Sequence, residues 1–241
     1  MRERLEAAVQ GLNADYCEIR VEDATSTHIG YRMRELESIG SSAALGGNIR
    51  AAVDGGWGFV SFNELDGLEE KVALAVRQAR LAARDGTRLA PVEPATEVVR
   101  ADVVKDPAEV SLADKKALMD GYVESALSVS DKIQTSQIYY SDSFRRVRFA
   151  SSAGSYIEQD RMQVRAAGSI SARDGGDIQT GRTSRTSTSD YGAIEGLHEE
   201  PPGRGRGRWT CWRPARRVAV SSLWLWTRRW PACSSMRRSG T

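Results

Sequence analysis

The chain has 241 residues, with 34 Lys and Arg, 32 Asp and Glu, and a formal net charge of +2 at pH 7. All the acidic residues precede Pro201, and the last 41 residues hold ten Arg but no Lys, Asp or Glu. The net charge of +2 is therefore the sum of about −8 on the first 200 residues and +10 on the last 41. No apolar run approaches the roughly 20 residues of a membrane-spanning helix, and the start lacks the layout of an export signal, so the cytoplasm is the expected location.

Residues 1–86 predict a small domain in the order helix, antiparallel strands, long helix. Apolar residues at helical spacing predict a helix over 2–12. Alternation with a period of two predicts strands over 16–22, 27–33, 38–44 and 48–53. We expect a turn at Gly46-Gly47 and a hairpin turn at Asp54-Gly55-Gly56. Residues 65–83 carry the clearest amphipathic stripe and predict a long helix.

The following residues predict a linker and a second domain. Pro91 and Pro94 favour an extended linker over 87–106, because proline cannot continue a helix. In the domain expected over 107–196, Ser111 is a candidate helix cap with Asp114 as its partner. Strands are expected over 132–141, 145–150, 156–166 and 178–188, as a meander of long antiparallel strands. The predicted class is α+β, with a disordered tail over 197–241.

Few residues could carry catalysis by a metal or a nucleophile. His28 and His198 are the only histidines, and Cys17 is the only cysteine before the last 41 residues. Zinc sites use three or four ligands, often at short spacing, and His198-Glu199 is followed by Glu200-Pro201 rather than by a second histidine. The sequence therefore predicts no catalytic, cofactor-binding or metal-binding residues in this chain.

The segment GGWGF, from Gly55 to Phe59, is the most unusual motif of the first 200 residues. A phosphate-binding loop needs a helix after the glycines, whereas strands are predicted on both sides. We interpret it as a tight hairpin whose glycines adopt positive φ and whose Trp57 and Phe59 cover the sheet. Ligand binding is the alternative.

Three segments, taken together, resemble a known family. ADYCEIRVE from Ala14, ELES from Glu35 and VDGGWGFVS from Val53 resemble, in order and spacing, the N-terminal domain of the TldD/PmbA family of metalloproteases. The resemblance extends through the helix of 65–83 and more loosely to about Gly196. It implies a dimeric zinc peptidase that acts on peptides or unfolded segments, with two His as zinc ligands and a Glu as general base.

The Arg-rich end of the chain permits two interpretations. Its RGRGRW string from Arg204 would suit nucleic-acid binding, because guanidinium groups neutralise phosphates and aromatic rings stack on bases. However, when the codons of 225–241 are read one base earlier they can encode VDPALAGVFIHEAFGH, which is similar to the zinc motif of the family. We therefore expect a frame change between 195 and 202, and residues 197–241 to be out of frame.

The resemblance and the frame change together give a functional hypothesis. This chain is expected to be a truncated TldD-like zinc metallopeptidase that lacks the catalytic domain and is itself inactive. One alternative is a non-catalytic PmbA-like subunit of a homo- or heterodimer. A nucleic-acid-binding protein that uses the Arg/Trp tail is the third.

Overall fold

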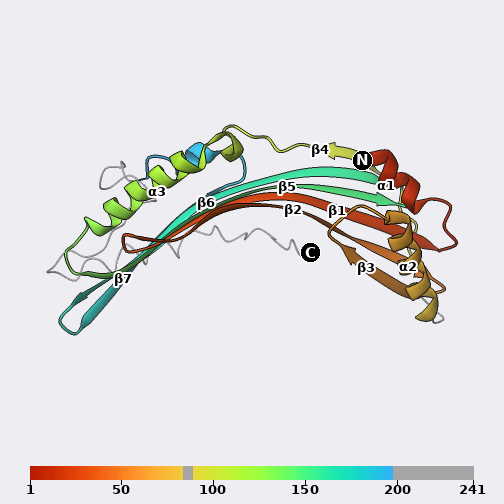
Figure 1. Cartoon of the computed structure of the whole chain (residues 1–241), viewed down its shortest axis with the longest axis horizontal. Coiled ribbons are helices and arrows are strands. Elements are labelled where there is room, and N and C mark those ends of the chain that lie inside the picture. The colour runs from red at the N-terminus through yellow and green to blue at the C-terminus, as the bar shows by residue number, and fades with distance from the viewer. Residues whose placement is uncertain (84–88, 198–241) are drawn as a thin grey trace, which may run out of the picture.

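The computed structural model describes residues 1–83 and 89–197, which form one long, arched sheet with helices on its outer side (Figure 1). The sheet has seven strands in the order β3-β2-β1-β5-β6-β4, with β7 also paired to β6. Every pairing is antiparallel except that of β4 with β6. The predicted α+β class is confirmed, whereas the expected tail over 197–241 falls almost wholly outside the described residues.

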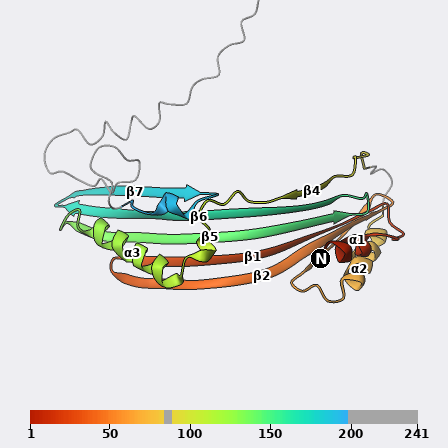
Figure 2. The ribbon, with the colours of Figure 1, turned by 90° about the horizontal axis from the view of Figure 1, so that it is seen from above.

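The strands are longer than the alternation in the sequence predicts. Their bounds are β1 Tyr16–Arg32, β2 Glu35–Val53, β3 Gly56–Phe62, β4 Thr96–Val99, β5 Ile133–Ser151, β6 Tyr156–Asp174 and β7 Asp177–Ser187. At about 3.3 Å per residue, the 17 residues of β1 extend roughly 55 Å. Pairs of shorter predicted strands have merged into β1, β2 and β5. In β1 and β5 both neighbouring strands stay paired through the residues between them, and in β2 the pairing with β1 is continuous. Figure 2 shows these strands running the length of the molecule.

Three α-helices and two short 3₁₀ helices complete the described residues. They are α1 Arg2–Val9, α2 Leu68–Leu81, α3 Leu112–Leu127, η1 Pro107–Glu109 and η2 Tyr191–Ile194. The predicted cap of α3 is confirmed, since Ser111 Oγ accepts from the Asp114 backbone N–H at 3.1 Å and donates to its carboxylate at 2.7 Å. Within these residues, no helix is long and apolar enough to cross a membrane.

Both hydrophobic cores lie on the outer, convex face of the sheet. Odd-numbered residues of β1 are buried at each end, where Cys17 and Ile19 join the core under α1 and α2, and Ile29 and Tyr31 join the core under α3. Residues of one parity along a strand share one face. The helices therefore all cover the same face, and no helix among the described residues lies on the concave one (Figure 1).

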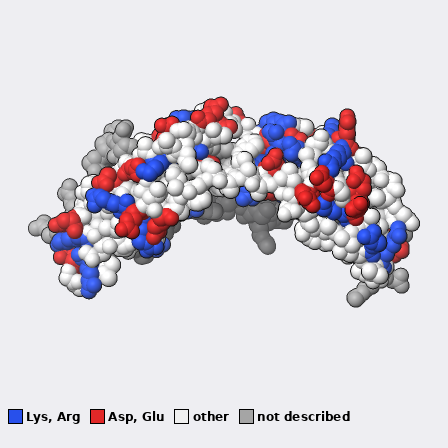
Figure 3. All heavy atoms as spheres, viewed as in Figure 1, with Lys and Arg blue, Asp and Glu red and all other residues white. Residues whose placement is uncertain are grey.

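Charged side chains occupy the convex face between the two cores. Arg146 Nε donates to Asp160 at 2.7 Å, Arg148 Nε donates to Glu158 at 3.1 Å, and Arg100 bridges both carboxylates. The hydrogen bond from Arg146, with a smaller effect of Arg100, holds the pKa of Asp160 below its ordinary value. Figure 3 shows basic and acidic side chains interspersed along the molecule rather than gathered into a patch of one sign.

The turn predicted at Gly46-Gly47 is wrong, because both glycines continue β2. Gly47 pairs with Val21 of β1 on one side and with Phe62 of β3 on the other. A Cβ atom on Gly47 would lie 2.5 Å from the Phe62 ring and 2.5 Å from the Arg20 carbonyl oxygen. Here glycine is needed for close packing inside a strand, not for a turn.

A single sheet joins the segments predicted as two domains. Strand β1, from the segment 1–86, pairs over residues 18–32 with β5, from the segment 107–196. The predicted linker over 87–106 contains β4, which pairs in parallel with Tyr156–Gln159 of β6. The division into domains at these boundaries stays a prediction.

Candidate functional site

The concave face of the sheet is the candidate functional surface, since no helix of the described residues covers it. It carries the side chains of alternate residues from all the long strands. At the end formed by β3 these are aromatic, and towards the middle they are mostly small, polar or charged, with both signs of charge present. Such a broad face suits an extended ligand or a partner more than a small molecule.

The β3 hairpin places the aromatic end of this face. Asp54 and Gly55 have φ of 48° and 76°, as a type I′ turn requires, so the predicted hairpin turn is confirmed. Alternation along β3 then directs Trp57 and Phe59 to the concave face, where they are 39% and 55% exposed. The prediction that these two rings cover the sheet fits their placement.

The expectation that every glycine of the hairpin adopts positive φ is wrong for Gly56 and Gly58. Neither has a positive φ. A Cβ atom on Gly58 would lie 1.9 Å from the Ala75 carbonyl oxygen, and one on Gly56 would lie 2.3 Å from that of Ala79. These glycines let α2 pack directly on the backbone of β3. No local pattern in the sequence distinguishes this role of a glycine from turn formation.

The side chains of Tyr16 and Arg50 contact the ring of Trp57. The Tyr16 ring meets it edge-on at 6.4 Å between centroids, and the Arg50 guanidinium lies 5.7 Å from its centroid. Glu18 ties both neighbours together, accepting from the Tyr16 hydroxyl at 2.7 Å and from Arg50 Nε at 2.6 Å. Burial and the hydrogen bond to Glu18 raise the pKa of Tyr16, because both favour the protonated phenol that donates to Glu18.

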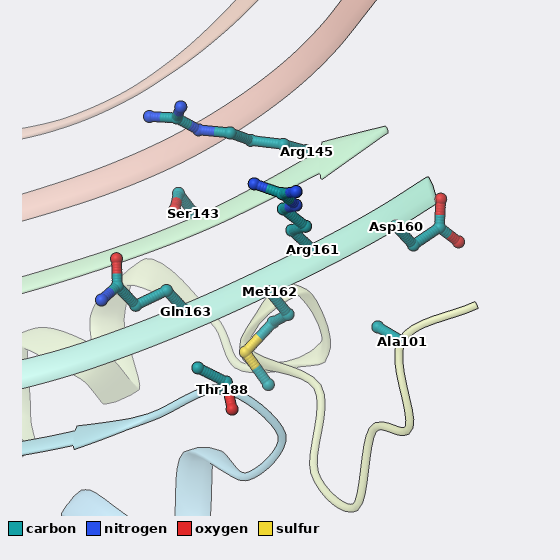
Figure 4. Close-up of a pocket in the computed structure, with 8 residues that line it drawn as sticks. All are labelled: Ala101, Ser143, Arg145, Asp160, Arg161, Met162, Gln163 and Thr188. Atoms are coloured by element: carbon teal, nitrogen blue, oxygen red, sulfur yellow. The ribbon is translucent and has the colours of Figure 1, made fainter. Parts of the chain in front are cut away.

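A cavity of about 450 Å³ opens further along the sheet, beside β5 and β6. Figure 4 shows Ser143 and Arg145 of β5 and Arg161 and Gln163 of β6 extending to one side, whereas Met162 extends towards Thr188. Its lining includes side chains from both faces of the sheet, at the edge of β6. No pattern in the sequence indicated it, because its walls come from four separate segments.

The structure does not assemble the residues considered for metal binding. Cys17 is buried in the core under α1 and α2, with a thiol pKa that burial raises to about 11. His28 is exposed on the opposite, concave face of the same strand, and His198 lies outside the described residues. Among residues 1–83 and 89–197, no three His, Cys, Asp or Glu come together where they could hold a metal ion. The described residues therefore do not fit a zinc site.

Two family models match this chain in order. The model described as PmbA/TldA metallopeptidase domain 1 matches residues 17–83, and the one described as PmbA/TldA metallopeptidase central domain matches residues 105–219. A metalloprotease of Synechocystis sp. is 38% identical over 187 residues, which are 77% of this chain and 40% of that protein. A metalloprotease of Methanothermobacter thermautotrophicus is 26% identical over 193 residues, 80% of this chain and 42% of its own length. The chain thus spans about two fifths of these relatives.

Solved structures share the fold. A candidate modulator of DNA gyrase from Bacteroides thetaiotaomicron has a TM-score of 0.67 and 16% identity, covering 80% of this chain and 47% of its own. TldE from Thermococcus kodakarensis has a TM-score of 0.61 and 16% identity, covering 77% of this chain and 43% of its own.

Proposed function

Because this chain belongs to the PmbA/TldD metallopeptidase family, we propose that it forms the non-catalytic N-terminal and central part of a TldD-like zinc metallopeptidase. The observation that carries the proposal is the match to domain 1 and the central domain in that order, together with 38% identity to a metalloprotease of which the chain spans 40%. In this proposal the intact protein hydrolyses peptides or unfolded segments in the cytoplasm.

In the intact protein, zinc and its ligands belong to residues other than those described. Hydrolysis by a zinc peptidase needs protein ligands around the ion and a base for the attacking water. Among the described residues, no cluster of three His, Cys, Asp or Glu could hold the ion. The contribution of this chain is instead a long concave sheet face, with an aromatic end at Trp57 and a polar middle, against which an extended substrate can lie.

A frame change between 195 and 202 would account for the absence of the zinc motif from this polypeptide, whereas the central-domain match extends past that point to residue 219. The support is the codon argument: Trp226 followed by Thr227 must encode Asp when read one base earlier, and the codons that follow permit IHEAFGH. The test is to sequence the coding DNA over this region. An unbroken reading frame that stops after Thr241, with no second frame continuing the motif, would overturn this part of the proposal.

Zinc content and peptide hydrolysis test the inactive state of the chain itself. We expect well under one zinc per chain after dialysis, and no cleavage of an unfolded polypeptide substrate. Restoring the frame should produce a longer protein that retains zinc and cleaves the substrate. Stoichiometric zinc in the 241-residue chain, measured by elemental analysis, would contradict the proposal.

A second candidate is a PmbA-like, non-catalytic subunit of a homo- or heterodimer. The exposed aromatic rings of Trp57 and Phe59 on an otherwise uncovered face favour it, because large exposed apolar groups often mark protein contacts. Sedimentation of the chain alone and mixed with the frame-restored protein separates these candidates. A new species whose mass is the sum of the two proteins supports the subunit candidate. Independent sedimentation of the chain and the frame-restored protein excludes it.

A further inference from the structure

Two arginines face each other directly across the concave side of β5 and β6. Arg145 pairs with Arg161 in the register of these strands, and both side chains are exposed. Directly opposite residues on one face have Cβ atoms about 5 Å apart, and like charges in this position destabilise a sheet. We infer that Arg145 and Arg161 bind the carboxylate of an acidic side chain in an extended peptide segment.

The adjacent pair of residues on the same strands shows that this arrangement is not forced by the fold. One residue further along, on the convex face, Arg146 pairs with Asp160, and the two form a double hydrogen bond at 2.7 and 2.9 Å. At this point the convex face pairs a positive charge with a negative one. The concave face instead pairs two positive charges.

The described residues leave the concave arginines under-neutralised. Glu22 lies 3.4 Å from Arg145 but also 3.7 Å from Arg20, so one carboxylate serves two guanidinium groups. Arg161 donates to the neutral amide oxygen of Gln159 at 2.9 Å, and no carboxylate of the described part of the chain lies within ion-pair distance of it. An additional carboxylate would balance this cluster with charge-assisted hydrogen bonds.

The cavity next to the arginine pair indicates a ligand larger than a free anion. It measures about 450 Å³ and adds the hydroxyl of Ser143 and the amide of Gln163 to the two guanidinium groups (Figure 4). Asp160 also lines it, but its carboxylate is already bonded to Arg146. Among the described strands, β4 pairs with β6 only to Gln159 and β7 only from Val164, so residues 160–163 have no strand on that side. Space for a chain and polar groups for its backbone therefore adjoin the carboxylate site.

This inference rests on the proposed function, because it names the substrate or partner segment that the concave face would take. The test measures binding and not hydrolysis, so it can fail while the peptidase proposal holds, and the reverse. The probes are two fluorescent heptapeptides of Ala, Ser and Gln with blocked ends, one carrying a central Glu and the other a central Gln. Binding to the full 241-residue chain is followed by fluorescence polarisation at low ionic strength.

We expect the Glu peptide to bind at least tenfold more tightly than the Gln peptide, and the double variant R145Q/R161Q to abolish this preference. The matched control is R213Q/R216Q, which removes the same charge from the Arg-rich end and should leave the preference intact. Because the like-charge pair costs stability, R161Q should unfold at the same temperature as the unsubstituted chain or higher.

Four outcomes would overturn the inference. The Glu and Gln peptides could bind equally, or the preference could survive in R145Q/R161Q. The control R213Q/R216Q could also lose it equally, which would assign the preference to general attraction by the basic end. Inorganic phosphate serves as a competitor of the labelled Glu peptide. Displacement only at phosphate concentrations far above those of the unlabelled Glu peptide supports a peptide site. Displacement at equal concentrations of phosphate and unlabelled peptide would show that the arginines bind free anions.

Discussion

Lys115 and Asp142 form a buried ion pair beneath α3, with Nζ of Lys115 2.7 Å from Oδ2 of Asp142 and side-chain exposures of 5% and 10%. The Tyr140 hydroxyl donates to the same carboxylate, and the ammonium group lies 5.8 Å from the Tyr140 ring centroid. These contacts join α3 to β5 through polar groups inside a hydrophobic core.

Replacing Lys115 by Met should destabilise the protein by about 3–5 kcal/mol, because Asp142 would be left buried without its cation. The double variant K115M/D142L should recover most of that loss, since it removes both charges. Denaturant unfolding followed by circular dichroism gives the free energies. The control K116M breaks an exposed pair with Asp120 and should cost less than about 1 kcal/mol. Equal losses in K115M and K116M would contradict a special role for the buried pair.

Gly58 should tolerate no side chain, unlike Gly121 in the interior of α3. Gly58→Ala places a Cβ atom 1.9 Å from the Ala75 carbonyl oxygen, so α2 must move away from β3. Overpacking of this kind costs about 1–3 kcal/mol or more. Gly121→Ala meets no atom within 4 Å and removes a flexible residue from a helix, so it should stabilise by up to about 1 kcal/mol. Opposite signs in the two unfolding curves are the expected result, and a neutral Gly58→Ala would contradict the close packing.

How far the sequence predicts this fold depends on the range over which each signal acts. Local signals succeeded: the Ser111 cap, the Asp54-Gly55 turn and the amphipathic stripe of α2 all depend on residues close in sequence. Signals that depend on a distant partner failed, as at Gly47, whose role is set by the ring of Phe62, and at Gly58, whose role is set by α2.

The candidate site was less predictable for the same reason. Trp57 could be assigned to the sheet surface from the hairpin pattern alone. The pairing of Arg145 with Arg161 depends on the register of β5 and β6, and the cavity beside them also needs Ala101 and Thr188 from distant segments. No spacing along the chain encodes those distances.

The Arg146–Asp160 contact should stabilise the protein fully above the ordinary pKa of an aspartate and progressively less as the pH falls below it. The hydrogen bond from Arg146 is the largest cause that lowers the Asp160 pKa from 3.8. A lowered folded-state pKa gives stability that is present above the unfolded value and is lost as the pH falls through the folded value. R146Q should therefore be less stable than the unsubstituted chain at pH 7, and the difference should shrink below about pH 4.

Unfolding free energies measured from pH 7 down to pH 3 test this expectation. R32Q is the control, because Arg32 pairs with Glu37 where both side chains are about half exposed, and its effect should stay small throughout. If the free energy of unfolding differs between R146Q and the unsubstituted chain by the same amount at every pH, Arg146 acts through packing and not through its charge.

Cys17 should be inert in the folded protein although it is a free thiol. Its side chain is fully buried, and desolvation, with a smaller contribution from Glu18, raises its pKa from 9.0 to about 11. The thiolate is the reactive form, so a C211S/C233S variant should resist thiol reagents at pH 8 and react fully once denaturant is added. Since the folded-state pKa is raised, the stability that this protonated thiol contributes should be complete below about pH 9 and decline between pH 9 and about 11. Rapid labelling of the native variant at pH 8 would show that α1 and α2 open readily from the sheet, contrary to the packing of this core.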